Sequence, residues 1–137
     1  MIKLRDMSGV AAALCLAACA NLFGPSPAEE VQAALDRFHT AEKSGDLETV
    51  LDTFSDDFSN SLGATKPILR GFFAPLIAQG VLQQMTIDDT KAVIDVDGDS
   101  ATVTPVTYTT GMGAMSYVYT FRKEADGNWR IIQSETI

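Results

Sequence analysis

Residues 38–58 read FHTAEKSGDLETVLDTFSDDF, and this stretch carries the clearest structural signals in the 137-residue chain. Gly45 follows a helical pattern at the point where a glycine commonly ends a helix. Asp46 comes next and predicts the N-cap of a second, shorter helix. Asp56 and Asp57 then predict a turn that leaves this second helix. The acidic side chains of the stretch therefore serve as a cap, a solvated helix face and a turn, and not as a catalytic cluster.

The first helix begins well before this stretch and has clear signals at its start. Ser26 is a suitable N-cap, Pro27 suits the first helical position, and Glu29 completes an S-x-x-E capping box. Apolar residues then recur at helical spacing and form one stripe: Val31, Ala34, Leu35, Phe38 and Ala41. The pattern predicts one amphipathic helix between Ser26 and Gly45.

Downstream of residue 58, helical signals give way to strand signals. A third helix with a broad apolar face is expected from Lys66, and Pro75 should bend or end it near Ala74. A short helical piece, VLQQM, follows. From about Thr86 the alternation of apolar and polar residues predicts four strands joined by hairpin turns: residues 90–97, 100–110, 114–124 and 129–137. Pro105 predicts a bulge or a sheet edge. Helices followed by such strands predict an α+β domain with an antiparallel sheet.

Three motifs in this order resemble the nuclear transport factor 2-like superfamily, which includes ketosteroid isomerase and the SnoaL-like polyketide cyclases. They are residues 38–58, DGDSATV at 97–103 and YVYTFRKEADGNWRI at 117–131. The resemblance covers residues 28–137. It implies helices packed in the concave face of a curved antiparallel sheet, a cystatin-like cone with a pocket between helix and sheet. It also implies frequent dimers through the outer face of the sheet.

The same resemblance gives a specific expectation about chemistry. Enzymes such as ketosteroid isomerase use an Asp as base, together with a Tyr and a protonated Asp. The family places this base a few residues beyond the acidic pair, where this chain has Leu62 flanked by Asn60 and Ser61. None of these side chains accepts a proton near neutral pH. We therefore expect a non-catalytic domain. Two alternatives stay open: an enzyme with His39 or a tyrosine as an atypical base, and a structural, dimerising envelope protein.

Aromatic residues and methionines supply the candidate pocket. Filling the core is their ordinary role, but some could line a cavity, and a tyrosine offers a ligand both a ring and a hydroxyl. The candidate pocket residues are Phe38, His39, Phe58, Phe72, Tyr108, Met112, Met115, Tyr117, Tyr119 and Trp129. The expected occupant is a small apolar or amphipathic ligand, with a protein partner over the cone as the alternative.

The first residues read as an export signal. Residues 1–18 start with Lys3 and Arg5, and an apolar run of about twelve residues follows, which is too short to span a membrane. The sequence LAAC, at residues 16–19, resembles the lipobox of bacterial lipoproteins. That resemblance implies cleavage before Cys19, lipid on its thiol, and a short tether over residues 19–27. We expect the domain to face the periplasm from the outer membrane; cleavage after Ala20 would instead release it.

Composition removes several classes of function. With Cys15 in the signal peptide and Cys19 carrying lipid, the domain retains no thiol, and it has one histidine. No metal site and no disulfide is therefore predicted. A net charge of −8 excludes binding to nucleic acid phosphates. No phosphate-binding glycine motif is present, so no cofactor is predicted. The expected partners are the membrane through the anchor, a second copy of the chain, and the small ligand.

Overall fold

The computed structural model describes residues 24–137. The expected signal peptide, the lipidated Cys19 and the first part of the tether lie outside the described residues. The elements within residues 24–137 are α2 (Pro27–Ser44), α3 (Leu47–Asp52), α4 (Lys66–Ala78), α5 (Val81–Gln84), β1 (Thr86–Asp88), β2 (Val93–Asp97), β3 (Ser100–Thr110), β4 (Gly113–Lys123) and β5 (Trp129–Thr136). None of the helices in this part of the chain is long and apolar enough to cross a membrane.

The predicted helix caps are confirmed. The Ser26 hydroxyl accepts the Glu29 amide N–H at 3.2 Å, and Pro27 opens α2. Gly45 ends α2 in the left-handed conformation, with φ of 73°, which costs a glycine little. Asp46 then caps α3 by accepting the Thr49 amide at 3.2 Å. These local signals set the sharp corner between α2 and α3.

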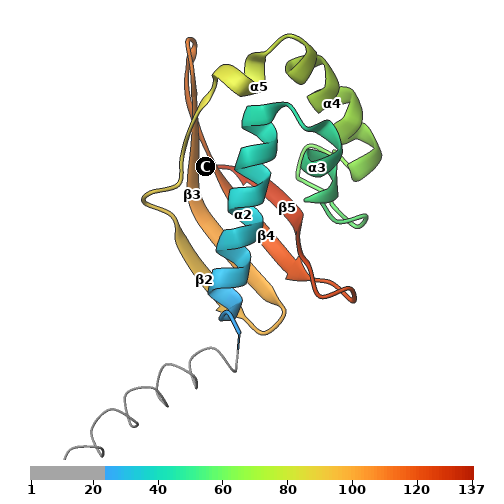
Figure 1. Cartoon of the computed structure of the whole chain (residues 1–137), viewed down its shortest axis with the longest axis vertical. Helices are drawn as coiled ribbons and strands as arrows, with labels where there is room; N and C mark the ends of the chain where they lie inside the picture. The colour runs from blue at the N-terminus through green and yellow to red at the C-terminus, as the bar shows by residue number, and fades with distance from the viewer. Residues whose placement is uncertain (1–23) are drawn as a thin grey trace, which may run out of the picture.

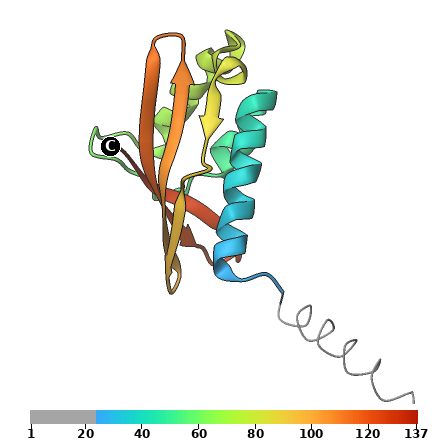
Figure 2. The same cartoon turned by 90° about the vertical axis from the view of Figure 1, so that its left-hand side faces the viewer.

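The strands form one antiparallel sheet with β3 near its centre. β4 lies beside β3 and β5 beside β4, while β1 and β2 pair with the two ends of β3 along its other edge. Figure 1 shows α2 lying across one face of this sheet, and Figure 2 shows the same layer from the side. The predicted α+β architecture, with helices on one face of an antiparallel sheet, is confirmed.

Two irregularities bend the long strands. The pairing of β3 with β4 shifts between Val103 and Val106, next to Pro105, as the proline predicted. The pairing of β4 with β5 shifts between Thr120 and Phe121. Such bulges increase local twist and bend the strand that carries them. They let the sheet curve around the side chains that α2 directs toward it.

The structure departs from the sequence expectations in two elements. β1 is a strand of three residues that no alternation pattern predicted. Helix α4 runs through Pro75 to Ala78, so of the two outcomes expected at Pro75, a bend or an end, the end near Ala74 does not occur. A proline ring meets the carbonyl of the residue four positions earlier, which is here Gly71, and α4 continues past this contact.

The core lies between α2 and the sheet. Val31, Leu35 and Phe38 follow the inner stripe of α2 and are at most 1% exposed. They meet the inward side chains of the sheet, of which the fully buried ones are Val103, Val106, Phe121 and Ile131. Phe54 and Phe58, from the segment after α3, close the core from the side and are also buried.

Candidate functional site

A continuous chain of aromatic contacts runs through this core. We call it the aromatic network. Centroid distances of 5.0–6.3 Å join nine rings. Its members are Phe38, His39, Phe54, Phe58, Phe72, Phe73, Tyr108, Tyr117 and Tyr119. Most pairs meet edge to face, the geometry that aromatic quadrupoles favour.

The aromatic network is buried in its middle and reaches the surface at two ends. Phe38 and Tyr119, whose rings lie 6.0 Å apart, are at most 6% exposed. At one end Phe72 on α4 is 58% exposed although its ring contacts the buried Phe73. At the other end Tyr117 is half-buried, and its hydroxyl donates to the sulfur of the exposed Met115. Side chains therefore fill the middle of the cone, while apolar surface remains at its margins.

A chain of polar groups is buried beside the rings. The Tyr119 hydroxyl donates to the Tyr108 hydroxyl at 3.0 Å, and Tyr108 donates to Glu42 Oε2 at 3.2 Å. Glu42 is 2% exposed, and burial raises the pKa of its carboxyl to about 8 against the smaller opposing effects of Tyr108 and Lys43. Burial likewise raises the pKa of both tyrosines. Near neutral pH Glu42 is therefore mostly protonated.

His39 lies one helical turn before Glu42 and is also largely enclosed. Its side chain is 14% exposed, Nδ1 lies 3.8 Å from Asp89 Oδ2, and Nε2 is buried without a hydrogen-bond partner. Burial lowers the pKa of His39, although Asp89 and Asp36 oppose the shift. No group of three His, Cys, Asp or Glu residues within residues 24–137 is placed to hold a metal ion.

The structure brings most of the ten sequence candidates together. Phe38, His39, Phe58, Phe72, Tyr108, Tyr117 and Tyr119 belong to the aromatic network, and Met115 touches it through Tyr117. Met112 does not join them, because it sits fully exposed at the β3–β4 turn. Trp129 also lies outside the network. Its indole N–H donates to Glu30 at 2.8 Å, where it lines a hollow of about 370 Å³ near the start of α2.

Sequence reasoning missed Glu42, although a signal for it was present. Glu42 stands four residues after Phe38 and seven after Leu35, so helical spacing continues the buried stripe through it. A carboxylate on an apolar stripe is rarely buried unless it is paired. The burial of Glu42 depends on the two tyrosines that β3 and β4 place opposite it, which the sequence of α2 alone does not reveal.

The position expected for a catalytic base faces solvent. Leu62 is 90% exposed, in a tight turn where the Asn60 side chain accepts the amides of Leu62 and Ala64. The amide and hydroxyl of Ser61 both donate to the Glu135 carboxylate on β5, which clasps this turn to the last strand. None of these groups reaches the buried tyrosines.

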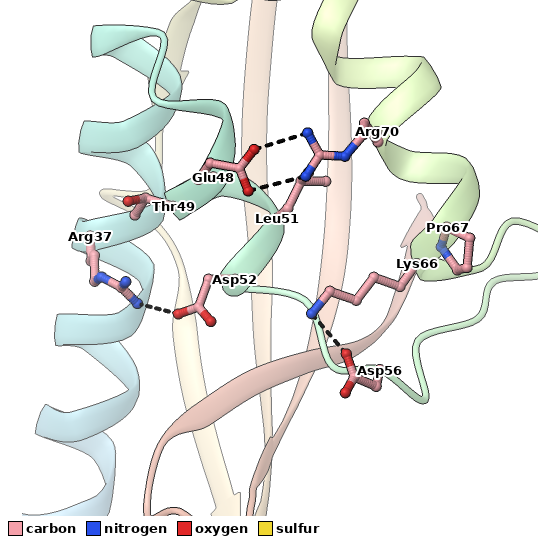
Figure 3. Close-up of a pocket in the computed structure, with 9 residues that line it drawn as sticks. All are labelled: Arg37, Glu48, Thr49, Leu51, Asp52, Asp56, Lys66, Pro67 and Arg70. Atoms are coloured by element: carbon pink, nitrogen blue, oxygen red, sulfur yellow. Dashed lines mark hydrogen bonds and ion pairs between the residues drawn. The ribbon is translucent and has the colours of Figure 1, made fainter.

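A separate hollow of about 790 Å³ lies between α2, α3 and α4 (Figure 3). Three ion pairs cross it: Arg37 with Asp52 at 3.1 Å, Arg70 with Glu48 at 2.9 Å, and Lys66 with Asp56 at 3.0 Å. Arg70 holds Glu48 through two parallel hydrogen bonds. Each of these charges has an opposite partner. The ion pairs are therefore better explained as contacts that hold the helices together than as groups that bind a ligand.

Comparisons with known proteins agree with this architecture. The model of the SnoaL-like domain family matches residues 31–136. A cystatin-like protein of unknown function from Nostoc punctiforme is 22% identical, with a TM-score of 0.61 over 78% of this chain and 86% of that one. A nuclear transport factor 2-like protein of unknown function from Pseudomonas putida is 15% identical, with a TM-score of 0.62 over 79% and 83%.

A protein of unknown function from Mycobacterium tuberculosis is 26% identical, with a TM-score of 0.60 over 79% of this chain and 73% of that one. No curated protein matches the sequence. The cystatin-like form of the expected cone is thus shown by its structural neighbours. These neighbours carry no reaction or ligand over to this chain.

Proposed function

Because the chain belongs to the SnoaL-like domain family, whose fold type supports many unrelated functions, we propose that it acts by binding and not by catalysis. In this proposal a lipid on Cys19 anchors the chain to the outer membrane, and the domain faces the periplasm. The domain binds a small apolar or amphipathic ligand at the margin of the cone.

One observation carries the ligand proposal: the aromatic network reaches the surface at Phe72 and at Tyr117. When a ligand covers an exposed phenylalanine that is continuous with a packed core, the free energy of binding becomes more favourable by about 25 cal/mol for each Å² of apolar surface removed from water. The half-exposed Ile68 lies one helical turn before Phe72 and extends the same apolar strip of α4. An apolar ligand body would complete the packing that the chain leaves open there.

The outward-facing Leu62 supports the absence of isomerase-type chemistry. Counted from the acidic pair, it is nearest to the position that the family resemblance implies for a base, and its side chain is 90% exposed. The neighbouring Asn60 and Ser61 use their polar groups within the turn and on Glu135. No group from this turn is available to move a proton inside the cone.

The lipobox and the position of the first helix support the anchored arrangement. Figure 1 shows the start of α2 at the lower end of the domain and the β3–β4 turn at the opposite end. Anchoring through a tether before α2 would hold the lower end near the membrane. Met112 and Met115, in and beside that turn, would then face away from the membrane.

Mass spectrometry under native conditions, on the protein purified from its own host, tests the ligand proposal. We expect a mass excess from a bound molecule that is lost on denaturation. Binding of the apolar fluorescent probe N-phenyl-1-naphthylamine should weaken in Phe72→Ala and remain in Leu62→Ala, a control at an apolar side chain that is more exposed than Phe72 and lies outside the network. Equal binding by both variants would place the ligand elsewhere. A mass of two chains would support the expected homodimer.

Fractionation of cells tests the anchor separately. The unmodified chain should be recovered with the outer membrane, and Cys19→Ser should be recovered in the soluble periplasmic fraction. Retention of Cys19→Ser in the membrane would contradict lipid anchoring without affecting the ligand proposal.

A second candidate is a proton-transfer enzyme with an atypical base, and Glu42 is the observation that favours it. A protonated carboxyl that accepts a hydrogen bond from Tyr108, which in turn accepts one from Tyr119, resembles the acid–base groups of such enzymes in kind. Deuterium exchange into the α-positions of a panel of ketones, followed by NMR, tests it. Exchange that Glu42→Gln abolishes would support catalysis, and exchange at the buffer rate would exclude it for that panel.

A further inference from the structure

We propose that Glu42, His39 and Tyr108 form a receptor for the ammonium group of an alkylamine. This inference rests on the proposed function, because it names the polar end of the ligand whose apolar body covers the aromatic network. It follows from unmet hydrogen bonds, a missing counter-charge and the aromatic surroundings of one buried acid.

Glu42 is a buried acid without a cation. Tyr108 is its hydrogen-bonding partner, and a neutral hydroxyl does not offset the cost of burying a carboxylate, so without a cation the group keeps its proton. The neighbouring Lys43 does not pair with Glu42 either, because its ammonium group donates to the backbone carbonyl of Met85. A leucine at this point of the stripe would bury apolar surface without this cost. The acid is therefore best explained by a cation that arrives with a ligand.

Two hydrogen-bonding positions are open side by side on α2. Nε2 of His39 is buried and has no partner. Glu42 uses Oε2 for Tyr108, and its second carboxyl oxygen has no hydrogen bond among the described residues. Residues three apart on a helix are surface neighbours, and Tyr108 touches both: its hydroxyl bonds Glu42, and its ring meets His39 edge-on at 6.3 Å. A primary ammonium carries three donors and suits this pair of acceptors.

The rings beside Glu42 make its surroundings apolar. Phe38 lies one helical turn before it, and the rings of Tyr108 and Tyr119 carry the hydroxyls of the polar chain. Where water is excluded, the attraction between a carboxylate and an ammonium group is stronger. A hydrophobic receptor alone would not place a carboxyl in this position.

The charged groups that face the site are mostly acidic. On α2 the titratable groups are Asp36, His39 and Lys43, and the ammonium group of Lys43 is directed to the carbonyl of Met85. Strands β3 and β4 contribute the neutral hydroxyls of Tyr108 and Tyr119. Asp89, in the segment after β1, lies beside His39. The chain as a whole carries −8. The field at the site therefore attracts cations and repels carboxylates.

Binding has a proton signature that an apolar site lacks. Near neutral pH the Glu42 carboxyl holds its proton, because its pKa is about 8. An alkylammonium stabilises the carboxylate, so the carboxyl O–H bond breaks and the proton passes to the buffer base. The complex is then an ion pair between the Glu42 carboxylate and the ammonium, and no proton leaves the amine.

Calorimetric titration of the full protein, purified in non-ionic detergent, tests this receptor. The probes are hexylamine, hexan-1-ol and hexanoate, each titrated in two buffers of different ionisation enthalpy near neutral pH. We expect hexylamine to bind with release of a proton, and hexan-1-ol to bind at least about tenfold more weakly, as the loss of a charged hydrogen bond predicts. Glu42→Gln should remove both the preference and the proton release. Glu48→Gln, an exposed acid paired with Arg70, should change neither.

The outcomes separate this inference from the proposed function. Equal affinity for hexylamine and hexan-1-ol, or binding without proton release, would overturn the amine receptor. If N-phenyl-1-naphthylamine binds and hexylamine does not, the apolar site stands and the receptor falls. If neither probe binds, both are wrong. Unchanged hexylamine binding by Glu42→Gln, in a variant whose circular dichroism matches the parent, would place the amine elsewhere.

Discussion

The hydroxyl of Tyr108 donates a hydrogen bond to Glu42 Oε2 across 3.2 Å and thereby joins β3 to α2 inside the core. Glu42 is the one buried residue with a carboxyl side chain in residues 24–137. Tyr119, Tyr108 and Glu42 thus form one buried chain of hydrogen bonds. We expect this chain to determine how the stability of the domain depends on pH and on the two tyrosine hydroxyls.

Stability should fall as the pH rises through the titration of Glu42. Its pKa is raised from 4.5 to about 8 in the folded domain, so the folded state binds the proton more tightly than the unfolded state. The stabilisation is complete below about pH 4.5 and is lost as the pH approaches and passes the folded value. The largest loss is roughly 3–5 kcal/mol. Urea unfolding across this range measures it, and Glu42→Gln should flatten this part of the curve.

Removing the Tyr108 hydroxyl should cost more than removing that of Tyr119. Tyr108→Phe leaves both the Glu42 carboxyl and the Tyr119 hydroxyl without their partner, which predicts a loss of about 1–3 kcal/mol. Tyr119→Phe breaks one bond and leaves the bond between Tyr108 and Glu42 in place. The pKa of Glu42 should rise further in Tyr108→Phe, because that hydrogen bond lowers it. Urea unfolding and NMR titration of the carboxyl measure the two effects; equal costs for both variants would contradict the series arrangement.

Two phenylalanines in the same aromatic network should respond differently to truncation. Phe54 is 3% exposed and contacts three other network rings. Phe54→Ala should lower the free energy of unfolding by about 3–5 kcal/mol. Phe72 is 58% exposed, and Phe72→Ala should cost less than about 1 kcal/mol. Thermal or urea unfolding compares them. A large loss in Phe72→Ala would show that this ring is covered in solution, for example by a second copy.

Two glycines offer a matched test of backbone strain. Gly45 has φ of +73°, and a Cβ there would lie 2.6 Å from Gln83 Nε2. Gly45→Ala should destabilise by about 1–3 kcal/mol through the unfavourable φ and the displaced Gln83. Gly71 lies inside α4 with open space around it. Gly71→Ala should stabilise by up to about 1 kcal/mol. Opposite signs in urea unfolding support this account, and equal signs would refute it.

Local signals made the helices and the order of the strands predictable. Ser26, Gly45 and Asp46 act through bonds to residues within a few positions, so the sequence alone identifies the corner they make. Pro105 likewise marked the bulge in β3. Pro75 left a bend and an end of α4 both open, because its effect depends on how the surrounding helix adjusts, and a sequence pattern does not show that adjustment.

The candidate site was predictable only in part, because burial depends on distant partners. The aromatic residues were found by their type, and most of them do meet. Whether they enclose a cavity or fill it depends on packing between α2 and strands more than sixty positions away. Glu42 illustrates the limit: a charged residue is normally assigned to solvent, and only the hydroxyls opposite it change that assignment.

The two hydrogen bonds from Ser61 to Glu135 limit how this domain can be redesigned as an enzyme. Leu62→Asp would place the new carboxylate in the bulk solvent. The bonds from Ser61 to Glu135 on β5 hold the turn in a position where the side chain at residue 62 faces outward. An engineer who wants isomerase activity from this scaffold would first have to release the turn, for example through Glu135→Ala, and then rebuild its path. Inserting the missing base is therefore a problem of backbone remodelling rather than of a single substitution.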